Sequence, residues 1–407
     1  MFIYFFLIRL AALFGHKKAR ALVKGQKAQK LASLEAYRGA VWFHAASVGE
    51  FEQARPIIER LRREQPNRKI VVTFFSPSGY EMRKGYETAD RVLYLPFATR
   101  RKARRFLDAL QPSMAIFVKY EFWPAYLHEL KKRAIPTYSI SAIFRPGQLF
   151  FLPWGKQHLK LLKCFTHIFV QDEASRVLLV KYGVTACSVA GDTRFDRMEE
   201  VRANRQKLTP QSRQVIEEFV RGAERVLVAG STWPEDEELL VKYISSPFTQ
   251  NTKMILVPHE IDEKHLHYIF QLLQGRMLRY SVVNACSQPL ANPAVDVLVI
   301  DALGLLSSIY PFGHVAYVGG GFGAGIHNTV EAAVYGKPVV FGPNYRHFRE
   351  AIGLIANGAA HSVSNYEQLE SALNHAFERC EEIGAKAALY VKDETGASEK
   401  IYGQIFS

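Results

Sequence analysis

At 407 residues the chain exceeds one ordinary hydrophobic core, and two domains of about 200 residues each are expected. Hydrophobic residues make up 48% of the sequence and charged residues 22%, which excludes a disordered chain. The formal net charge of +13 indicates an anionic partner: nucleic acid, an acidic membrane surface or a phosphorylated substrate. Basic residues are spread along the chain, without a zinc-finger, helix-turn-helix or aromatic RNA-binding signature, so we do not expect nucleic acid.

The N-terminal segment, residues 2–14, is apolar apart from Arg9 and is followed by a basic cluster between Lys17 and Lys30. As a helix it reaches about 20 Å, short of the roughly 30 Å hydrocarbon core. A cleaved signal peptide carries its charge before the apolar run, whereas here the charge mainly follows it. One interpretation is a first helix packed on the body. We favour a short anchor in the inner leaflet, with the basic cluster facing anionic headgroups on the cytoplasmic side.

Short β-branched or aromatic runs alternate with amphipathic stretches along the first half, which predicts a parallel, doubly wound sheet. The expected strands are 41–45, 70–74, 92–95, 114–118, 137–140 and 168–170. The expected helices between them include 54–63 and 101–110.

The second half repeats this rhythm, with expected strands at 226–229, 254–257, 297–300, 315–318 and 338–341. Residues 198–214 are charged, contain Pro210 and lack an apolar run, so we interpret them as the linker between two Rossmann-like domains. Two such domains are expected to face a central cleft, where ligands bind at the carboxyl ends of the strands. The last helix, near residues 396–405, is a candidate to cross back onto the first domain.

The first candidate site follows the strand at 41–45 and reads HAASVGE from His44 to Glu50. Ser47 and Glu50 have the spacing of a capping box that opens the next helix. The functional interpretation is that Glu50, where a strand meets a helix at the edge of the cleft, accepts a proton. A capping box does not require His44 or Gly49.

A second acid, Glu121, follows the strand that ends at Val118, in the run Tyr120–Pro124. Pro124 and Glu121 also suit an ordinary helix start. In the functional interpretation Glu121 lies at the same edge as Glu50, and the two carboxylates divide roles, one as base and one stabilising positive charge.

The third candidate is Arg194, in the glycine-containing loop Gly191–Asp196. A guanidinium in such a loop meets a phosphate with two parallel hydrogen bonds. The alternative is a surface arginine paired with Asp196.

The most specific motif is a strand, a glycine-rich loop and a helix start, from Val318 through Gly319–Gly325 to Ala333. Glycines allow backbone amides to approach a phosphate, and a helix beginning near Thr329 adds positive potential. No acid that would hold a nicotinamide cofactor's ribose follows about twenty residues later, so we favour a nucleotide sugar. Glu331, early in the helix, is a candidate for the ribose hydroxyls or, alternatively, an acid that favours the helix dipole.

No metal site is expected, because the histidines are scattered and form no HExxH arrangement. The cysteines form no CxxC pair and have no metal-ligand spacing, so we expect reduced thiols. They are Cys164, Cys187, Cys286 and Cys380.

These motifs, in this order, resemble the bacterial Kdo (3-deoxy-D-manno-octulosonic acid) transferases, a family of GT-B glycosyltransferases. The resemblance runs from about residue 30 to about residue 365 and is specific as an ordered set. The family's "HAASVGE" resembles residues 44–50, and its "ETELWP" resembles 119–124. Its "GnlKFD" resembles 191–196, and its "GGHNxxE…GP" resembles 325–331 with 342–343. Its "GSTHxGEE" resembles 230–237.

The resemblance implies an inverting transfer of Kdo from CMP-Kdo to a lipid A precursor at the cytoplasmic face of the inner membrane, without a bound metal or other cofactor. Glu50 would be the general base, and Glu121 and Arg194 would stabilise the transition state. The cytidine monophosphate would contact residues in three segments: Pro258 and His259; Leu303, Gly304 and Leu305; Asn328, Thr329, Val330 and Glu331. We therefore expect a membrane anchor in 1–30, an acceptor-binding domain in 31–200 and a nucleotide-sugar-binding domain in 201–407.

The chain departs from the family pattern at four places. Lys119 stands where the family has an acid, Arg194 replaces a lysine, and Trp233 replaces a histidine. The family's basic "PRHPER" becomes Pro258–Glu263. Two other functions stay open: a GT-B enzyme that uses a UDP-sugar on a lipid acceptor, and a non-catalytic nucleotide-binding protein at the membrane.

Overall fold

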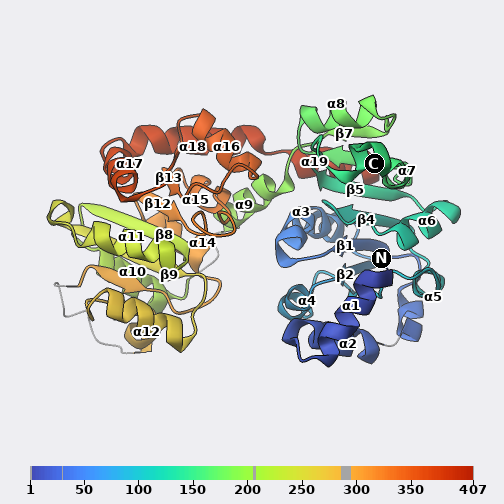
Figure 1. Ribbon diagram of the computed structural model, residues 1–407, viewed down its shortest axis with the longest axis horizontal. Coiled ribbons are helices and arrows are strands. Elements are labelled where there is room, and N and C mark those ends of the chain that lie inside the picture. The colour runs from blue at the N-terminus through green and yellow to red at the C-terminus, as the bar shows by residue number, and fades with distance from the viewer. Residues whose placement is uncertain (1, 30, 205–207, 286–294, 407) are drawn as a thin grey trace. The chain divides into compact units, whose positions relative to one another are not determined.

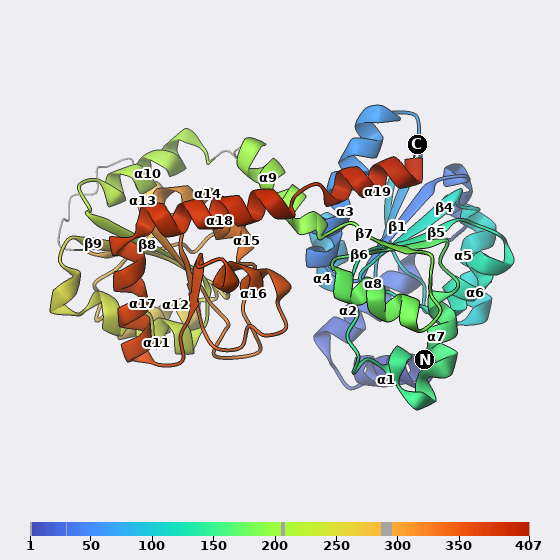
Figure 2. The same ribbon diagram turned by 90° about the horizontal axis from the view of Figure 1, so that it is seen from above.

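The computed structural model describes residues 2–29, 31–204, 208–285 and 295–406. The chain divides into two compact units (Figure 1), and each is built on a parallel sheet. Unit 1 contains the chain up to Arg197 and again from Thr395 on, and unit 2 contains Met198–Glu394. In both, helices cover the two faces of the sheet (Figure 2), as expected for a doubly wound fold.

The sheet of unit 1 has the strand order β3-β2-β1-β4-β5-β6-β7, and its strands run parallel. The strands are β1 (Val41–Ala45), β2 (Ile70–Phe74), β3 (Arg91–Tyr94), β4 (Met114–Val118), β5 (Thr137–Ala142), β6 (His167–Val170) and β7 (Cys187–Val189). The helices are α1 (Phe2–Leu13), α2 (Lys17–Ala28), α3 (Val48–Glu64), α4 (Pro77–Arg83), α5 (Arg100–Leu110), α6 (Pro124–Lys132), α7 (Lys156–Leu162), α8 (Glu173–Lys181) and α19 (Ala397–Phe406), with short 3₁₀ turns at Leu31–Tyr37, Leu149–Phe151 and Pro153–Gly155.

The sheet of unit 2 has the order β10-β11-β9-β8-β12-β13-β14, again parallel. Its strands are β8 (Arg225–Thr232), β9 (Thr252–Pro258), β10 (Leu278–Arg279), β11 (Val297–Val299), β12 (Val315–Val318), β13 (Val339–Phe341) and β14 (Ala360–Ser362). Its helices are α10 (Pro210–Val220), α11 (Pro234–Ile244), α12 (Glu263–Leu272), α13 (Tyr280–Ala285), α14 (Leu306–Ile309), α15 (Val330–Ala333), α16 (Arg349–Ala356), α17 (Tyr366–Glu378) and α18 (Cys380–Glu394), with 3₁₀ turns at Pro247–Thr249 and Tyr310–Phe312; α9 (Thr193–Asn204) begins in unit 1 and ends in unit 2.

Side chains of the central strand β1 alternate between two cores. Val41 and Phe43 pack into the core shared with α3 and α19, whereas Trp42 packs into the core shared with α5 and α6. This is the two-residue period of a strand covered on both faces. The same alternation turns His44 to the Trp42 side, next to Thr73, its partner residue on β2.

The parallel α/β fold is confirmed, and β1, β2, β4 and β12 have the predicted bounds. Unit 2 begins at Met198, where the predicted linker begins, but this segment is mostly helical, because α9 and α10 occupy most of 198–214. Thr209 caps α10 by accepting a hydrogen bond from the Ser212 amide, and Pro210 takes the first helical position. Residues 205–207, between these helices, lie outside the described residues.

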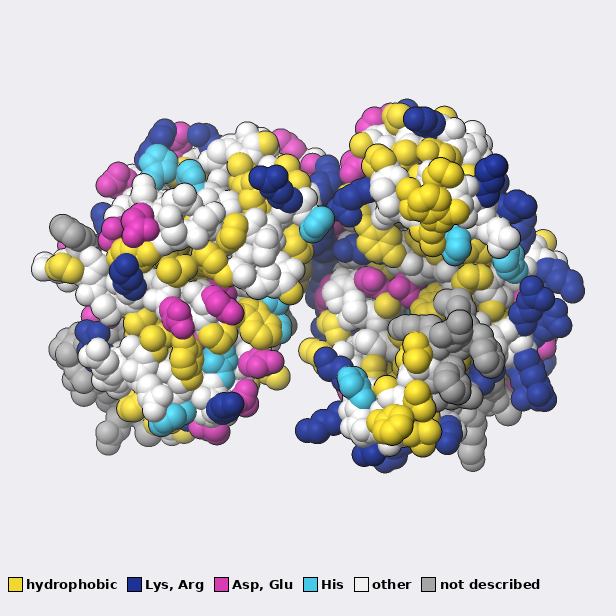
Figure 3. All heavy atoms as spheres, viewed as in Figure 1, with side chains coloured by type: hydrophobic (Ala, Val, Ile, Leu, Met, Phe, Trp, Pro, Cys, Tyr) yellow, Lys and Arg dark blue, Asp and Glu magenta, His cyan; other side chains and the backbone are white. Residues whose placement is uncertain are grey.

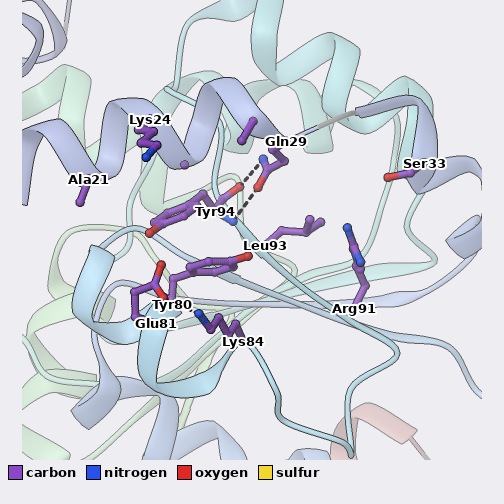
Figure 4. A pocket seen from close by; sticks show the side chains of 12 residues that line it. Ala21, Lys24, Gln29, Ser33, Tyr80, Glu81, Lys84, Arg91, Leu93 and Tyr94 are labelled. Carbon is purple, nitrogen blue, oxygen red and sulfur yellow. Dashed lines mark hydrogen bonds and ion pairs between the residues drawn. The ribbon is translucent and has the colours of Figure 1, made fainter.

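The N-terminal helices pack on unit 1. Phe5 of α1 is only 5% exposed. Gln29, directly after α2, makes two hydrogen bonds with the backbone of Tyr94 on the edge strand β3, as Figure 4 shows. Gln26 makes two more, with Leu95 and Phe97. The Gln29 amide thus bonds backbone groups that the edge strand otherwise leaves unpaired.

The other face of α1 is open: Leu13 is 77% exposed, and Phe14, which follows the helix, is 83% exposed. Across the described ranges, no helix combines the length and the apolar character that a membrane crossing requires.

Candidate active site

Glu50 lies in the first turn of α3, directly after β1. The amide of Glu50 donates to the Ser47 hydroxyl, the N-cap of the helix, at 3.4 Å. The carboxylate oxygen Oε2 accepts the amide of Ala46, one residue before the cap, at 2.6 Å. Only one of the two hydrogen bonds of the predicted capping box is therefore formed in its usual pattern, because the Glu50 carboxylate accepts the amide of Ala46 and not that of Ser47.

The second carboxylate, Glu121, follows β4, the neighbour of β1. Its Oε2 atom accepts the indole N–H of Trp123 at 2.6 Å and lies 2.9 Å from Nε2 of His44. The other ring nitrogen of His44, Nδ1, lies 2.9 Å from the Thr73 hydroxyl. His44 is fully buried and Trp123 nearly so, so Glu121 is fixed by two side chains that have no room to move.

These carboxylates interact electrostatically. Burial raises the pKa of Glu50 above its usual 4.5, and the charge of Glu121 raises it further. The Ala46 amide, His44 and Lys119 oppose the shift without cancelling it. A carboxylate with a raised pKa takes up a proton more readily, which suits a general base. We call His44, Glu50, Glu121 and Trp123 the carboxylate cluster.

The loop after β7 contributes a buried ion pair. Nε and one terminal nitrogen of Arg194 both donate to Oδ2 of Asp192, at 2.9 and 2.7 Å, and the Gln53 amide donates to Oδ1 at 2.6 Å. Burial acts to raise the pKa of Asp192, but Arg194 and Lys119 outweigh it, and the pKa is lowered. Asp196 instead accepts the amides of Gly396 and Ser398, at the start of α19.

Sequence reasoning missed the partners in this part of the site. Lys119 was noted only as a departure from a family pattern, yet its charge opposes the rise in the pKa of Glu50 and helps to lower the pKa of Asp192. Asp192 and Trp123 were present in the quoted motifs without a role. The signal that was available is their position directly after strands whose carboxyl ends meet at one edge of the sheet.

In unit 2, packing explains the glycines after β12. A Cβ on Gly319 would lie 2.4 Å from the Ser231 carbonyl oxygen, and one on Gly321 would lie 2.6 Å from Cα of Gly342. Gly320 and Gly325 have φ of +88° and +139°. The loop therefore needs glycine because it packs against two other backbone segments and turns where other residues are strained.

Many amides of this loop already have protein acceptors, which limits the predicted phosphate cradle. Gly320 donates to Asp236 at 2.8 Å. Backbone carbonyls accept the amides of Gly319, Gly323, Gly325, Ile326 and His327. The helix that follows, α15, has only four residues, because Gly336 (φ +66°) and Pro338 end the helical segment. The expected contribution of a helix dipole is correspondingly weak.

Three rings stack where β8, β9 and the glycine loop end. Trp233 stacks on His259 with ring centres 4.8 Å apart, and His259 lies 4.5 Å from His327. The Trp233 indole donates to Nε2 of His327 at 3.2 Å. Burial, helped by His259, lowers the pKa of His327 to about 4, so this ring is neutral at physiological pH.

Of the remaining predicted donor residues, the structure brings Asn328 and Glu331 together in one polar group. The Glu331 carboxylate accepts the Asn328 amide and the Ser307 hydroxyl, each at 3.2 Å. The structure thus joins α15 to the segment after Leu305, whereas Leu303 is 78% exposed and Gly304 turns with φ +81°. Pro258 ends β9, and Val330 is buried at the start of α15. The Thr329 hydroxyl is buried without a hydrogen-bond partner.

We predict that Gly321→Ala lowers the free energy of unfolding of the protein by about 1–3 kcal/mol, the usual cost of overpacking. Gly323→Ala is the matched control, because a Cβ there would meet nothing closer than 3.8 Å. Denaturant titration of the two variants measures the difference. Equal stabilities would show that the contact with Gly342 does not fix the loop.

Within the described ranges, no group of three or more potential ligand side chains is arranged to hold a metal ion. Cys164, Cys187 and Cys380 are free thiols there, and Cys286 lies outside these ranges. A separate cavity of about 650 Å³ lies between α2, α4 and β3 (Figure 4). It contains none of the predicted site residues.

Comparison with solved structures shows which fold the two units form. UDP-GlcNAc 2-epimerase from Neisseria meningitidis has a TM-score of 0.64 and 16% identity, covering 90% of this chain and 99% of that one. A trehalose-phosphate synthase from Burkholderia vietnamiensis has a TM-score of 0.53 and 10% identity, covering 90% and 98%. At these identities the likeness shows the fold alone: the two-unit GT-B architecture of many glycosyltransferases.

Sequence comparison is more specific. Residues 13–197 match the family described as 3-deoxy-D-manno-octulosonic-acid transferase (kdotransferase). The transferase of that name from Rickettsia prowazekii is 28% identical over 349 residues, covering 82% of this chain and 71% of the relative. The one from Aquifex aeolicus is 27% identical over 357 residues, covering 86% and 90%.

The fold and these relatives define a glycosyltransferase of the GT-B type. Within that class, the matched family and these relatives support a Kdo (3-deoxy-D-manno-octulosonic acid) transferase of lipopolysaccharide biosynthesis.

Proposed function

We propose that the chain transfers Kdo from CMP-Kdo to a lipid A precursor, with inversion of the anomeric centre. The observation that carries this proposal is the carboxylate cluster, in which Glu50 has a raised pKa beside a second, fixed carboxylate. A sugar hydroxyl is a poor nucleophile, so a base must take its proton as the attack develops. Glu50 is that base, and an attack opposite the leaving phosphate gives inversion.

Glu121 and Arg194 stabilise the charges that develop. The anomeric carbon of the donor gains positive character as its bond to phosphate breaks, by analogy with glycoside hydrolysis, and a fixed carboxylate favours it. Arg194 is held by Asp192 with its side chain still 19% exposed. Its charge would balance the phosphate of the departing CMP. A monophosphate leaving group needs less neutralisation than a diphosphate, so we propose that transfer proceeds without a divalent metal.

Unit 2 holds the cytidine monophosphate in this proposal. The Glu331 carboxylate, oriented by Asn328 and Ser307, can accept hydrogen bonds from the ribose hydroxyls. The stacked rings of Trp233, His259 and His327 lie in the same unit. Pro258, Leu303, Gly304, Leu305, Thr329 and Val330 are the further residues that we assign to the donor.

The enzyme acts, we propose, at the cytoplasmic face of the inner membrane. The exposed apolar face of α1 precedes cations of α2 that are also exposed. Figure 3 shows Lys and Arg side chains gathered along the edge of unit 1 where α5 and α6 lie. The exposed cations there include Arg100, Arg101, Arg104, Arg105, Lys131 and Lys132. Apolar side chains flanked by cations are typical of helices that lie in an anionic membrane surface.

The product of the reaction tests the proposal. We expect the purified protein, given CMP-Kdo and a tetra-acylated lipid A precursor in anionic vesicles, to sediment with the vesicles and to yield an acceptor heavier by Kdo units. Mass spectrometry of the lipid measures this. An unchanged acceptor, with CMP bound but not released from CMP-Kdo, would indicate a non-catalytic nucleotide-binding protein instead.

Competition by free nucleotides in the same incubation identifies the donor. Free CMP is expected to compete with CMP-Kdo, and free UDP is not; the reverse would favour a UDP-sugar transferase.

Excess EDTA, added to the same incubation, is expected to leave the rate of transfer unchanged. A rate that EDTA abolishes and Mg²⁺ restores would contradict the metal-free mechanism.

A further inference from the structure

The first helix contacts the carboxylate cluster, although it lies outside every sequence motif. The Phe5 ring of α1 stacks on Trp123, with ring centres 6.1 Å apart and planes 17° from parallel. It also contacts Phe97, with ring centres 4.9 Å apart. Because Phe5 is almost fully buried, these contacts belong to the core of unit 1 and are not a chance meeting at the surface.

Trp123 transmits this contact to Glu121. Its indole N–H donates to Oε2 of Glu121 at 2.6 Å, and its ring meets His44, the other side chain at that oxygen, edge to face. Phe75 also packs against the indole, with ring centres 4.9 Å apart. An indole packed among three rings keeps one rotamer, and its N–H keeps one direction.

We propose that Phe5 is a positioning residue for Kdo transfer: by packing on Trp123, it holds Glu121 in the orientation that the reaction uses. This inference rests on the proposed role of Glu121. It gives α1 a second function beside membrane attachment, since its buried face braces the carboxylate cluster while its exposed face is available to lipid.

Phe5→Ala leaves a cavity beside the indole, into which Trp123 can turn. A displacement of about 1 Å at a catalytic group can cost roughly 10²-fold in rate, so we expect kcat to fall by up to that factor. The KM for CMP-Kdo should stay unchanged, because Phe5 is in unit 1 and the residues assigned to the donor, apart from Arg194, are in unit 2. The acid limb of the kcat profile should move to lower pH, since a Glu121 that moves away no longer raises the pKa of Glu50 as strongly.

Two comparisons separate positioning from general loss of stability. Leu22→Ala is the matched control, because Leu22 of α2 is buried in the same core cluster as Phe5. We expect it to lower the melting temperature with little change in kcat. Trp123→Phe keeps an aromatic ring but loses the N–H; in that background, Phe5→Ala should cause little further loss of kcat. Phe5→Leu, which retains most of the apolar volume, should recover most of the activity and serves if Phe5→Ala does not fold.

The inference is overturned if Phe5→Ala keeps wild-type kcat, if Leu22→Ala loses as much activity, or if the losses from Phe5→Ala and Trp123→Phe simply multiply. Glu121→Gln, assayed in parallel, separates this outcome from failure of the proposed function. A slow Glu121→Gln variant beside a fast Phe5→Ala variant would remove only the role of Phe5. A fast Glu121→Gln variant would remove the role of Glu121, and the positioning role with it.

Discussion

Replacing Glu50 by glutamine should abolish Kdo transfer while the protein still folds and binds CMP. Loss of a general base typically costs 10²- to 10⁴-fold in rate, and the glutamine oxygen can still accept the Ala46 amide that the carboxylate accepts at 2.6 Å. Steady-state transfer assays and calorimetric titration with CMP measure the two expectations. Ser47→Ala is the matched control: it removes the cap of the same helix and should cost about 1 kcal/mol of stability with kcat almost unchanged.

The pH dependence of Glu50 gives a second signature. As a base Glu50 must be ionised, so kcat should fall as pH drops through a pKa that burial and Glu121 place above the usual 4.5. Stability should show the opposite sign. A carboxyl with a raised folded-state pKa stabilises the fold below its usual pKa, and that contribution is lost as pH rises through the folded-state value. Glu50→Gln should therefore be at least as stable as the wild type at neutral pH. Near-normal turnover with a lowered melting temperature would mean that Glu50 is only a capping residue.

Local patterns were sufficient to predict most strands of the two sheets. The apolar runs at β1, β2 and β4 are buried on both faces and flanked by polar turns, so their ends follow from hydrophobicity alone. Strands β7, β10 and β14, with two or three residues each, were not predicted. Helix α9 was missed because its sequence is rich in charges and has no apolar run. Ion pairs one helical turn apart, such as Arg202 with Glu199, support it instead.

The sequence motifs identified the residues of the candidate site, but not the contacts that those residues make. The motif after β1 identified Glu50, but the contact of His44 with Thr73 depends on strand register, which the motif does not contain. The glycine loop suggested phosphate binding, whereas Gly319 and Gly321 pack against Ser231 and Gly342, which are distant in sequence. The contact between Phe5 and Trp123 joins residues more than a hundred positions apart, and nothing local predicts it.

Replacing Arg194 by alanine should destabilise the protein and stop transfer together. Asp192 is buried, and Arg194 contributes two of its hydrogen bonds. Removing one partner of a buried pair leaves an uncompensated charge and typically costs 3–5 kcal/mol. Loss of the same guanidinium removes the group that we assign to the leaving phosphate. Arg194→Lys keeps a positive charge, though not the two-pronged geometry, and should retain most of the stability and part of the activity.

The sign of the pH dependence distinguishes this explanation from a general loss of packing. In the wild type, Arg194 lowers the pKa of Asp192 below its usual 3.8, so the pair stabilises the fold above that pH and the contribution is lost as pH falls through the lowered value. In Arg194→Ala burial dominates, the pKa of Asp192 rises, and stability should instead decrease as pH rises through it. Denaturant titrations between acid and neutral pH measure both slopes.

Arg176→Ala is the control, because Arg176 forms an exposed pair with Glu173 on α8 and its loss should leave stability and kcat unchanged. If Arg194→Ala and the wild type keep parallel pH profiles, Asp192 is not held ionised by Arg194, and another cation, with Lys119 the first candidate, supports its charge.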